Sequence, residues 1–363
     1  NYRYGTDLRN APHTTPEALD LMKQVWDFHN NGARSLVMET SSHALQQCRV
    51  DGVHFDVGVF TNLTPEHLDY HIDMESYFKS KCRLFDDLLP RDSGRAVVNI
   101  DDRYGVRLAE RRPEALTCGQ TASADIHPVS LTSTLDGIQG TVRTPGGDIQ
   151  INSSLLGDYN IENLLCSIGA AVALELPIQT IEAGLARAPQ VPGRLERIEN
   201  DLKALVLVDY AHTGDALEKA LETLTALRPQ RVITLFGCGG DRDRSKRPVM
   251  GGVAVRHSDV TIVTSDNPRS EEPAAIIADI LPGVPPHAVP LNIDTVGTAT
   301  AKGYLVCSDR RAAIDLAVSL LRPGDLLLVA GKGHEDYQII GSRRIHFDDR
   351  EQLRNALSGS KEA

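Results

Sequence analysis

The second half of the chain alternates regularly between short apolar segments and longer segments of helical character. The apolar segments are typical of buried strands and lie at Ala204–Asp209, Arg231–Phe236, Val260–Thr264 and Asp325–Ala330. Helical stretches such as Gly214–Leu227 and Arg310–Leu321 separate them. Because parallel strands need a long crossover connection, which is usually a helix, this alternation indicates a Rossmann-like α/β fold. It predicts a parallel sheet covered by helices on both faces.

The first half is also α/β in character but is less regular. We expect buried strands at Ser35–Glu39, Val57–Asn62 and Ala96–Asp101, each ending in polar residues at the place where open α/β sheets bind ligands. From about Ala122 to Ser154, period-two alternation in a Thr-, Ser- and Gly-rich segment indicates hairpins. Asn160–Glu175, rich in Ala and Leu, is expected to form a helix.

The length of the chain and a proline- and glycine-containing interruption predict two domains. A chain of 363 residues is longer than one typical domain. Pro189, Pro192 and Gly193 interrupt the pattern between the halves. We therefore place one domain over residues 1–190 and a second over residues 191–363.

Charge and composition exclude several classes of function. The chain has 38 Lys and Arg against 49 Asp and Glu, a net charge of −11, and no long basic run, so we expect it to bind neither nucleic acid nor an anionic membrane. No apolar run approaches the ~18–20 residues of a transmembrane helix, and the first residues lack a signal-peptide pattern. The six cysteines are scattered singly, which predicts reduced thiols in a cytoplasmic protein.

Three segments of the first half carry reactive side chains, and each also has a simpler structural explanation. Glu39 precedes the hydroxyls of Ser41 and Ser42, an arrangement that can hold a cation and an anion or can merely cap a helix. His67 and His71 stand four apart, as metal ligands or as surface residues of one helix face. Lys81 lies among apolar neighbours, where a neutral amine can take up carbon dioxide and become a carbamate ligand for Mg²⁺, although a surface lysine is the simpler expectation.

Three successive strand ends in the second half favour a small-molecule site. Gly237–Asp243 combines a glycine turn with Arg242, whose guanidinium can bind a carboxylate or a phosphate. Asp266–Arg269 supplies a carboxylate, an amide and a guanidinium within four residues, and Gly331–Glu335 follows the last strand. Gly331-Lys332 superficially matches a P-loop, but Leu326 stands where its first glycine belongs.

These segments occur in a specific order along nearly the whole chain. The order is Glu39–His43, Asn62–His71, Lys81, Gly157–Asn163, Pro192–Arg194, Asp209–Thr213, Gly237–Asp243, Asp266–Arg269 and Gly331–Glu335. In this order they resemble the Mur ligases, and most closely the branch that adds meso-diaminopimelate in peptidoglycan synthesis.

The resemblance implies a three-domain architecture in which a UDP-binding domain precedes a P-loop ATPase domain and a Rossmann-like domain. On this comparison, the chain begins after the UDP-binding domain and the phosphate-binding glycine loop. Residues 1–190 would be the remainder of the central ATPase domain, and residues 191–363 would be the C-terminal domain. We therefore expect the chain alone to have no ligase activity.

The resemblance also implies the reaction and its ligands. ATP would phosphorylate the D-glutamate carboxyl group of UDP-N-acetylmuramoyl-L-alanyl-D-glutamate, and the amine of meso-diaminopimelate would attack the acyl phosphate. Mg²⁺ would offset the repulsion between the anionic groups. The expected enzyme is a cytoplasmic monomer with small-molecule substrates.

Residue roles carry over by position in the matching motifs. Catalysis and Mg²⁺ binding fall to Glu39, His67 and Lys81 as its carbamate. The muramoyl-dipeptide substrate would contact Thr14, Thr15, Ser41, Gln47 and Arg49. ATP would contact Asn62, Asn160, Asn163, Arg194 and Asp209. The meso-diaminopimelate site would comprise Arg242, Asp266, Asn267, Pro268, Arg269, Gly331 and Glu335.

Two alternatives remain from the residues themselves. A related ligase, such as a lysine-adding enzyme or a folylpolyglutamate synthetase, shares the architecture, but the Asp266–Arg269 segment argues against both. A nucleotide- or amino-acid-binding module without catalysis is the other alternative. A G-x-x-G-K-[ST] loop encoded just before Asn1 would favour the enzyme, and its absence would favour the module.

Overall fold

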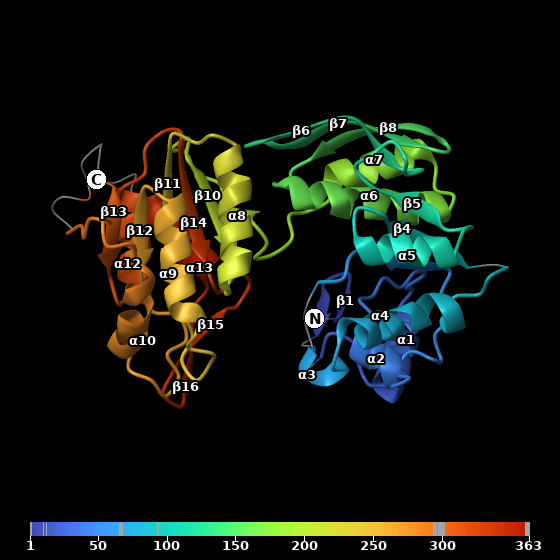
Figure 1. Ribbon diagram of the computed structural model, residues 1–363, viewed down its shortest axis with the longest axis horizontal. Helices are drawn as coiled ribbons and strands as arrows, with labels where there is room; N and C mark the ends of the chain where they lie inside the picture. The colour runs from blue at the N-terminus through green and yellow to red at the C-terminus, as the bar shows by residue number, and fades with distance from the viewer. Residues whose placement is uncertain are drawn as a thin grey trace. The chain divides into compact units, whose positions relative to one another are not determined.

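The computed structural model describes residues 2–9, 11, 13–64, 68–92, 94–292, 296 and 302–359. The chain divides into two compact units (Figure 1). Unit 1 comprises Asn1–Thr132, Gln139–Asn152 and Tyr159–Ala186, and unit 2 comprises Ser133–Ile138, Ser153–Asp158 and Arg187–Ala363. Among the described helices, none is both long enough and apolar enough to cross a membrane.

Unit 2 is built on a six-stranded sheet with the order β13-β12-β11-β14-β10-β9. The strands are β9 (Glu196–Arg197), β10 (Leu205–Asp209), β11 (Arg231–Phe236), β12 (Val260–Val263), β13 (Gly303–Val306) and β14 (Asp325–Ala330). The strands β10 to β14 pair in parallel, and only the short edge strand β9 is antiparallel to its neighbour. Leu328 of β14 lies opposite Leu207 of β10 on one side and Thr234 of β11 on the other.

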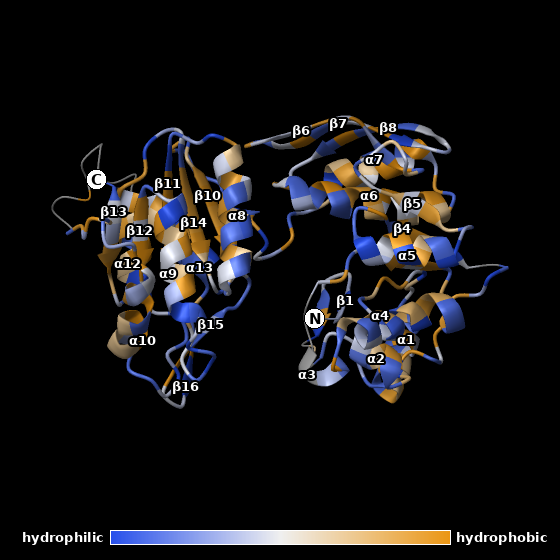
Figure 2. Ribbon diagram, in the orientation of Figure 1, coloured by the Kyte–Doolittle hydropathy of each residue, from blue (hydrophilic) through white to orange (hydrophobic). Residues whose placement is uncertain are grey.

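Helices cover both faces of this sheet. On one face lie α8 (Gly214–Ala226), α9 (Lys246–His257) and α10 (Pro273–Ile280), and on the other lie α12 (Arg310–Ser319) and α13 (Asp349–Gly359). Successive strand residues point to opposite faces, so Leu207 joins the first core and Val208 the second. Because both faces are buried, these strands are apolar almost throughout (Figure 2). The predicted Rossmann-like fold is confirmed.

Short elements complete unit 2. A hairpin of β15 (Tyr337–Ile340) and β16 (Arg343–His346) follows β14, and a 3-10 turn at Leu281–Gly283 follows α10. The segments Ser133–Ile138 and Ser153–Asp158 belong to this unit because Leu135 and Leu156 pack into its core.

Unit 1 contains a parallel sheet with the order β3-β4-β5, formed by Val57–Phe60, Arg95–Asn99 and Leu116–Cys118. Around it lie α1 (Ala18–Asn30), α2 (Ser42–Gln46), α3 (Leu68–His71), α4 (Met74–Arg83), a π-helical turn at Leu84–Leu88 and α5 (Arg103–Arg111). The core between them is rich in aromatic residues, with Phe60 packed edge-on against Phe78 and Phe85. At the amino-terminal end, β1 (Tyr2–Tyr4) and β2 (Asp7–Arg9) form a small hairpin.

The Thr-, Ser- and Gly-rich segment folds into a second small sheet, β6-β7-β8. Its strands are His127–Thr134, Gly137–Thr144 and Gly147–Ser153, joined by two-residue turns. Connections this short can only join antiparallel strands, so the hairpins expected from period-two alternation are present. The helices α6 (Asp158–Ala173) and α7 (Ile178–Arg187) follow.

One predicted strand is wrong. Ser35–Glu39 has no regular secondary structure, and Leu36 and Val37 are exposed. A strand forms only when another strand satisfies its backbone groups, and no described strand pairs with this segment. Its apolar sequence was therefore not sufficient to predict a strand.

Candidate active site

The carboxyl ends of the parallel strands in unit 2 bring several predicted site residues to one edge of the sheet. Asp209 is the last residue of β10, Gly237 follows β11, and Gly331 follows β14. Asp266 lies shortly after β12. From β11 the chain continues into α9 on one face, whereas after β14 it continues towards α13 on the other. The strand ends beside such a reversal are where open α/β sheets bind ligands.

Asn267 connects the loop after β12 to the loop after β14. It is buried, and its Nδ2 donates to Oε2 of Glu335 at 3.0 Å. Its Oδ1 accepts from the backbone N of Ile339 at 2.9 Å. The neighbouring carbonyl oxygen of Asp266 accepts from Nε2 of Gln338 at 2.6 Å. The structure therefore brings Asp266, Asn267 and Glu335 together and fixes the orientation of the amide.

Arg269 is held by its backbone and by its side chain. Its φ of 53° lies in the left-handed region, and its backbone pairs with Ile339 and Gly341. Its Nη1 donates to the carbonyl oxygen of Gly240 at 2.8 Å. Glu271, two residues further along the chain, pairs with Arg247. The Arg269 guanidinium thus lies at the edge that Asn267 and Glu335 occupy.

The glycine loop after β11 packs backbone against backbone with the Asp266–Arg269 segment. A Cβ on Gly240 would lie 1.9 Å from the carbonyl oxygen of Pro268, so only glycine fits there. Pro268 is itself buried. Arg242 is exposed at the far end of this loop, and its Nη1 donates to the carbonyl oxygen of Asp241 at 3.2 Å.

A buried arginine that sequence reasoning missed supports this loop. The Arg247 side chain is fully buried and donates to both carboxylate oxygens of Glu271, at 2.7 and 2.9 Å, and to Asp279 at 2.8 Å. Its Nη2 also donates to the carbonyl oxygen of Gly239. These bonds from Arg247 lower the pKa of the Glu271 carboxyl to about 2. The sequence offered no signal for this role, because a charged residue at the start of a helix is normally exposed.

Two further buried cations were also missed. Arg310 and Lys332 are 2% and 0% exposed, and both contact the loops that carry Asp266 and Gly331. Lys332 belongs to the Gly331–Glu335 segment, whose sequence does not match a P-loop and does not reveal that this lysine is buried. The periodicity of a sequence cannot distinguish a buried, paired lysine from a surface one.

Gly193, Arg194 and Asp209 form a second group in unit 2. The carboxylate of Asp209 accepts from the backbone N of Leu195 at 2.7 Å and of Ala211 at 2.8 Å. Burial raises the pKa of Asp209, and these two hydrogen bonds act in the opposite direction. The Arg194 guanidinium lies 5.2 Å from the centre of the Tyr210 ring. This cation–π contact presents a flat, cationic surface that suits a nucleotide.

In unit 1, hydrogen bonds of Thr15 connect two segments that are expected to bind the nucleotide substrate. Its buried hydroxyl donates to the carbonyl oxygen of Glu39 at 2.9 Å and accepts from the backbone N of Ser41 at 3.0 Å. The Ser41 hydroxyl accepts from the backbone N of Ala44 at 3.2 Å, so Ser41 is also the N-cap of α2. Thr14 and the Glu39 side chain are exposed next to this network.

Arg49 and Gln47 extend the same group. Nη1 of Arg49 donates to the carbonyl oxygen of Thr15 at 3.2 Å, and its Nε donates to Oε1 of Gln47 at 2.8 Å. Nη2 of Arg49 pairs with the exposed Glu17 at 3.0 Å. The structure therefore brings together Thr15, Ser41, Gln47 and Arg49 from segments more than 25 residues apart.

Lys81 lies near the end of α4, with its Nζ 5.3 Å from the centre of the Tyr77 ring. Tyr77 stacks in turn on His71, whose Nε2 is 2.8 Å from the hydroxyl of the buried Ser42. His67, which we expected to be a metal ligand, lies outside the described residues. The Tyr77 ring beside Lys81 fits the apolar surroundings expected for this lysine.

The predicted ATP contacts are divided between the units. Asn160 is buried and its Oδ1 accepts from Nδ2 of Asn163 at 3.0 Å, whereas Asn62 is exposed just after β3. These three residues belong to unit 1, and Arg194 and Asp209 belong to unit 2. Lys81 and Asp266 are likewise in different units.

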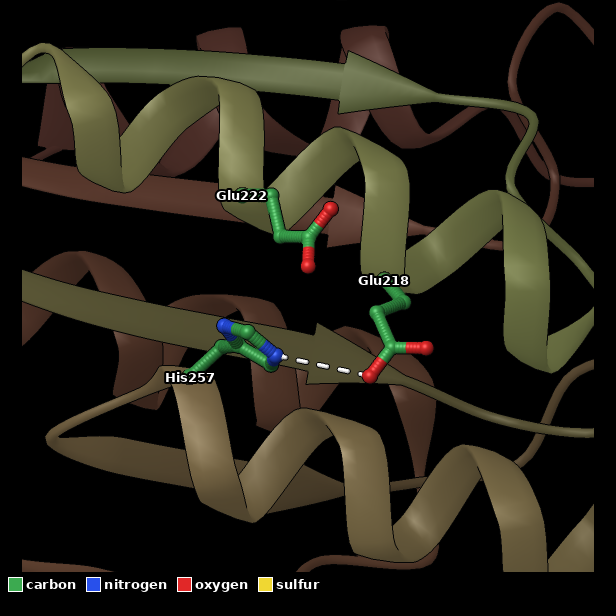
Figure 3. A group of neighbouring side chains, drawn as sticks. All are labelled: Glu218, Glu222 and His257. Atoms are coloured by element: carbon green, nitrogen blue, oxygen red, sulfur yellow. Dashed lines mark ion pairs between the residues drawn. The ribbon is translucent and has the colours of Figure 1, made fainter.

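Figure 3 shows a different group of potential metal ligands, formed by Glu218 and Glu222 on α8 and His257 at the end of α9. Nε2 of His257 lies 3.7 Å from Oε1 of Glu218, and Nη2 of Arg256 lies 3.2 Å from the same oxygen. Glu218 therefore already has a cationic partner in Arg256 and a second neighbour in His257. These three side chains lie where α8 and α9 pack against each other, and none of them is an expected Mg²⁺ ligand.

Comparison with protein families places nearly the whole chain. Residues 2–171 match the Mur ligase middle domain, and residues 193–333 match the Mur ligase, glutamate ligase domain. A protein of Geobacter metallireducens named UDP-N-acetylmuramoyl-L-alanyl-D-glutamate–2,6-diaminopimelate ligase is 52% identical over 98% of this chain and 71% of its own length. A protein of the same name from Gloeobacter violaceus is 48% identical over 98% of this chain and 70% of its own length.

Solved structures of ligases also resemble this chain. A structure titled with the same ligase name is 34% identical, covers 98% of this chain and 71% of that one, and gives a TM-score of 0.72. The folylpolyglutamate synthase of Mycobacterium tuberculosis covers 78% of this chain and 62% of its own, with a TM-score of 0.59 at 19% identity. The second likeness shows a common fold only.

Proposed function

The chain belongs to the Mur ligase family, and we propose that it ligates meso-diaminopimelate to UDP-N-acetylmuramoyl-L-alanyl-D-glutamate at the expense of ATP. ATP transfers its γ-phosphoryl group to the D-glutamate carboxylate. The amine of meso-diaminopimelate then attacks this acyl phosphate, so that an amide bond forms, the carbon–oxygen bond to phosphate breaks, and a proton is lost from the nitrogen. The reaction is a step of cytoplasmic peptidoglycan precursor synthesis by a monomeric enzyme.

One observation carries the choice of amino acid: a guanidinium, two carboxylates and an amide converge at the strand ends of unit 2. Asn267 binds Glu335 directly, and Arg269 lies two residues further along the same loop. An amino-acid terminus carries one ammonium and one carboxylate group. Carboxylates suit the ammonium, and the guanidinium can bind the carboxylate through two parallel hydrogen bonds.

This combination favours meso-diaminopimelate over lysine. meso-Diaminopimelate has an amino-acid terminus at both ends, whereas the far end of lysine has only an ammonium group. Lysine would leave Arg269 without an anion, and a buried or half-buried charge that loses its partner is strongly unfavourable. Arg242 would contribute a second cationic contact, and Gly331 and Glu335 would complete the site.

Unit 1 would hold the nucleotide substrate. The network of Thr15, Ser41, Gln47 and Arg49 is pre-organised by its own hydrogen bonds. Its exposed donors, together with Thr14, suit the carboxylate and amide groups of a muramoyl dipeptide. The proposed ATP contacts are Asn62, Asn160, Asn163, Arg194 and Asp209.

The residues of unit 1 also fit a magnesium ion. Mg²⁺ prefers oxygen ligands, and the exposed Glu39 carboxylate supplies them. An ammonium group on Lys81 would repel the ion, whereas a carbamate on the same nitrogen adds two oxygens and a negative charge. Glu39, His67 and carbamylated Lys81 would hold the ion, which would neutralise charge on the phosphoryl group in transit. The ring of Tyr77, 5.3 Å from the Lys81 nitrogen, gives this side chain an apolar neighbour, and apolar surroundings favour the neutral amine that takes up carbon dioxide.

The test is a competition assay with the complete protein that contains this chain. We expect kcat/KM to be higher for meso-diaminopimelate than for L-lysine by roughly 10²-fold or more, and Arg269→Ala to remove most of that preference. Arg256→Ala, which changes an exposed arginine of α9, is the matched control and should keep the preference. Equal use of both amino acids by the wild type would contradict the proposal, as would a preference that survives in Arg269→Ala.

A further inference from the structure

We propose that Lys332 is a positioning residue of the amino-acid site, whose buried ammonium holds Asp266, Asn267 and Glu335 in their binding arrangement. This inference rests on the proposed function, because it assigns a role within the meso-diaminopimelate site. Lys332 was not among the residues expected to contact the substrate. Its side chain is 0% exposed, so it acts through its neighbours and not by touching the amino acid.

The contacts of Lys332 converge on the site residues. Its Nζ lies 3.4 Å from Oε2 of Glu335, 3.5 Å from Oδ1 of Asn267 and 3.6 Å from Oδ1 of Asp266. The nitrogen also donates to the carbonyl oxygen of Tyr337 and lies 5.4 Å from the centre of its ring. One cation therefore contacts three side chains of the predicted site, which come from two different strand ends.

These neighbours need a cation between them. Asp266 and Asn267 are 7% and 3% exposed, and the Asp266 and Glu335 carboxylates share the Lys332 nitrogen as an ion-pair partner. Oδ1 of Asp266 is buried and accepts no hydrogen bond from the described residues, so the ion pair with Lys332 compensates the charge on this oxygen directly. Without Lys332, two carboxylates would face each other in a poorly solvated site, and they would separate or take up a proton.

Either response would weaken binding of the amino acid. Glu335 would move away from Nδ2 of Asn267, from which it accepts a hydrogen bond at 3.0 Å, and the amide would keep only the hydrogen bond from Ile339 to fix its orientation. A protonated carboxyl group binds a substrate ammonium less well than a carboxylate does. Lys332 is therefore expected to affect the KM for the amino acid and to leave the ATP and nucleotide subsites unchanged.

The test compares Lys332→Met, which keeps much of the side-chain volume but removes the charge, with Lys332→Arg, which keeps the charge. In the complete protein, we expect Lys332→Met to raise the KM for meso-diaminopimelate by roughly tenfold or more, with unchanged KM values for ATP and the UDP-linked substrate. Lys332→Arg should remain closer to the wild type. Lys219→Met, at an exposed position of α8, is the matched control and should change none of these values.

A double-mutant cycle separates positioning from a general structural effect. Because Lys332 acts through Glu335, adding Lys332→Met to Glu335→Gln should raise KM much less than it does in the wild-type background. Additive effects, or a Lys332→Met enzyme with the wild-type KM, would overturn the inference. Thermal unfolding establishes that each variant folds, and Lys332→Gln serves as a second neutral variant. If no neutral variant folds, Lys332 serves stability and not the site, and the inference is also overturned.

Failure of the proposed function has a different outcome. If the wild type does not use meso-diaminopimelate, the substrate assignment fails before any variant is compared. If the wild type uses it and the Lys332 variants behave like Lys219→Met, only the positioning role fails.

Discussion

Arg310 and Asp349 form a two-point ion pair in which both side chains are completely buried. Nε of Arg310 donates to Oδ1 of Asp349 at 2.8 Å, and its Nη2 donates to Oδ2 at 2.7 Å. The same guanidinium donates to the carbonyl oxygens of Ser265 and Ala330. These residues directly precede Asp266 and Gly331, so the pair ties α12 and α13 to the two strand ends that carry the site.

Removal of one partner should therefore be costly. We expect Asp349→Ala to lower the free energy of unfolding by about 3–5 kcal/mol, because it leaves the Arg310 guanidinium buried without its anion. Urea unfolding of the chain measures this difference. Asp215→Ala breaks an exposed pair with Lys219 on α8 and should cost only about 0.3–0.5 kcal/mol. Similar losses of unfolding free energy in the two variants would show that the buried pair stabilises the fold no more than the exposed pair does.

Lys81 provides a prediction about catalysis. We expect Lys81→Ala in the complete protein to lower kcat by roughly 10²-fold or more, because the carbamate and its charge are lost. A short carboxylate such as acetate, added in solution, should partly restore turnover. Lys79→Ala, at an exposed position on the same helix, is the control. If Lys81→Ala turns over at the wild-type rate, the carbamate is not required.

The Arg247–Glu271 pair predicts a dependence of stability on pH. The pKa of Glu271 is lowered from an ordinary value of 4.5 to about 2, chiefly by its hydrogen bonds from Arg247. The ionised carboxylate is thus favoured by folding, and its contribution is fully present above about pH 4.5 and is lost as the pH falls towards 2. The melting temperature of the wild type should exceed that of Glu271→Gln at pH 7, and the difference should narrow below pH 4.5.

Glu110→Gln, an exposed substitution on α5, controls for the change in net charge. A difference between the wild type and Glu271→Gln that stayed constant down to the lowest pH at which the chain folds would contradict this account.

The fold of unit 2 could be predicted from the sequence because its strands are buried on both faces. A strand such as Arg231–Phe236 is then apolar over nearly its whole length, and a segment with helical periodicity follows it. The same reasoning was wrong at Ser35–Glu39, because apolar character does not show whether a partner strand is present. It also missed β13 and the β15–β16 hairpin, which are short and partly exposed.

The site was predictable only in part for a related reason. The sequence predicted a site at Asp266–Arg269 because several polar groups follow one strand, and in the structure Asn267 of this segment contacts Glu335. Arg247, Arg310 and Lys332 are single charged residues whose burial depends on partners far away in the sequence, such as Asp349 for Arg310. Local patterns contain no information about such partners, so the supports of the site appear only in three dimensions.

Gly193 provides a last prediction, which concerns how closely two loops of unit 2 approach. Its φ is 68°, and a Cβ at this position would lie 2.3 Å from the backbone N of His334 and 2.5 Å from the carbonyl carbon of Gly333. Gly193→Ala therefore introduces both a strained backbone conformation and a clash with the backbone that carries Glu335. We expect it to lower the free energy of unfolding by about 2–4 kcal/mol and to raise the KM for the amino acid.

Gly184→Ala is the matched control for this substitution. Gly184 lies on the exposed side of α7, and a Cβ there would have no heavy atom within 4 Å. Alanine favours the helix, so this variant should be more stable than the wild type by about 0.5–1 kcal/mol with an unchanged KM. Urea unfolding and steady-state kinetics on the two variants measure both effects. Equal stability of the two alanine variants would mean that the loops can separate without loss, and the close approach at Gly193 would then have no role in holding Glu335.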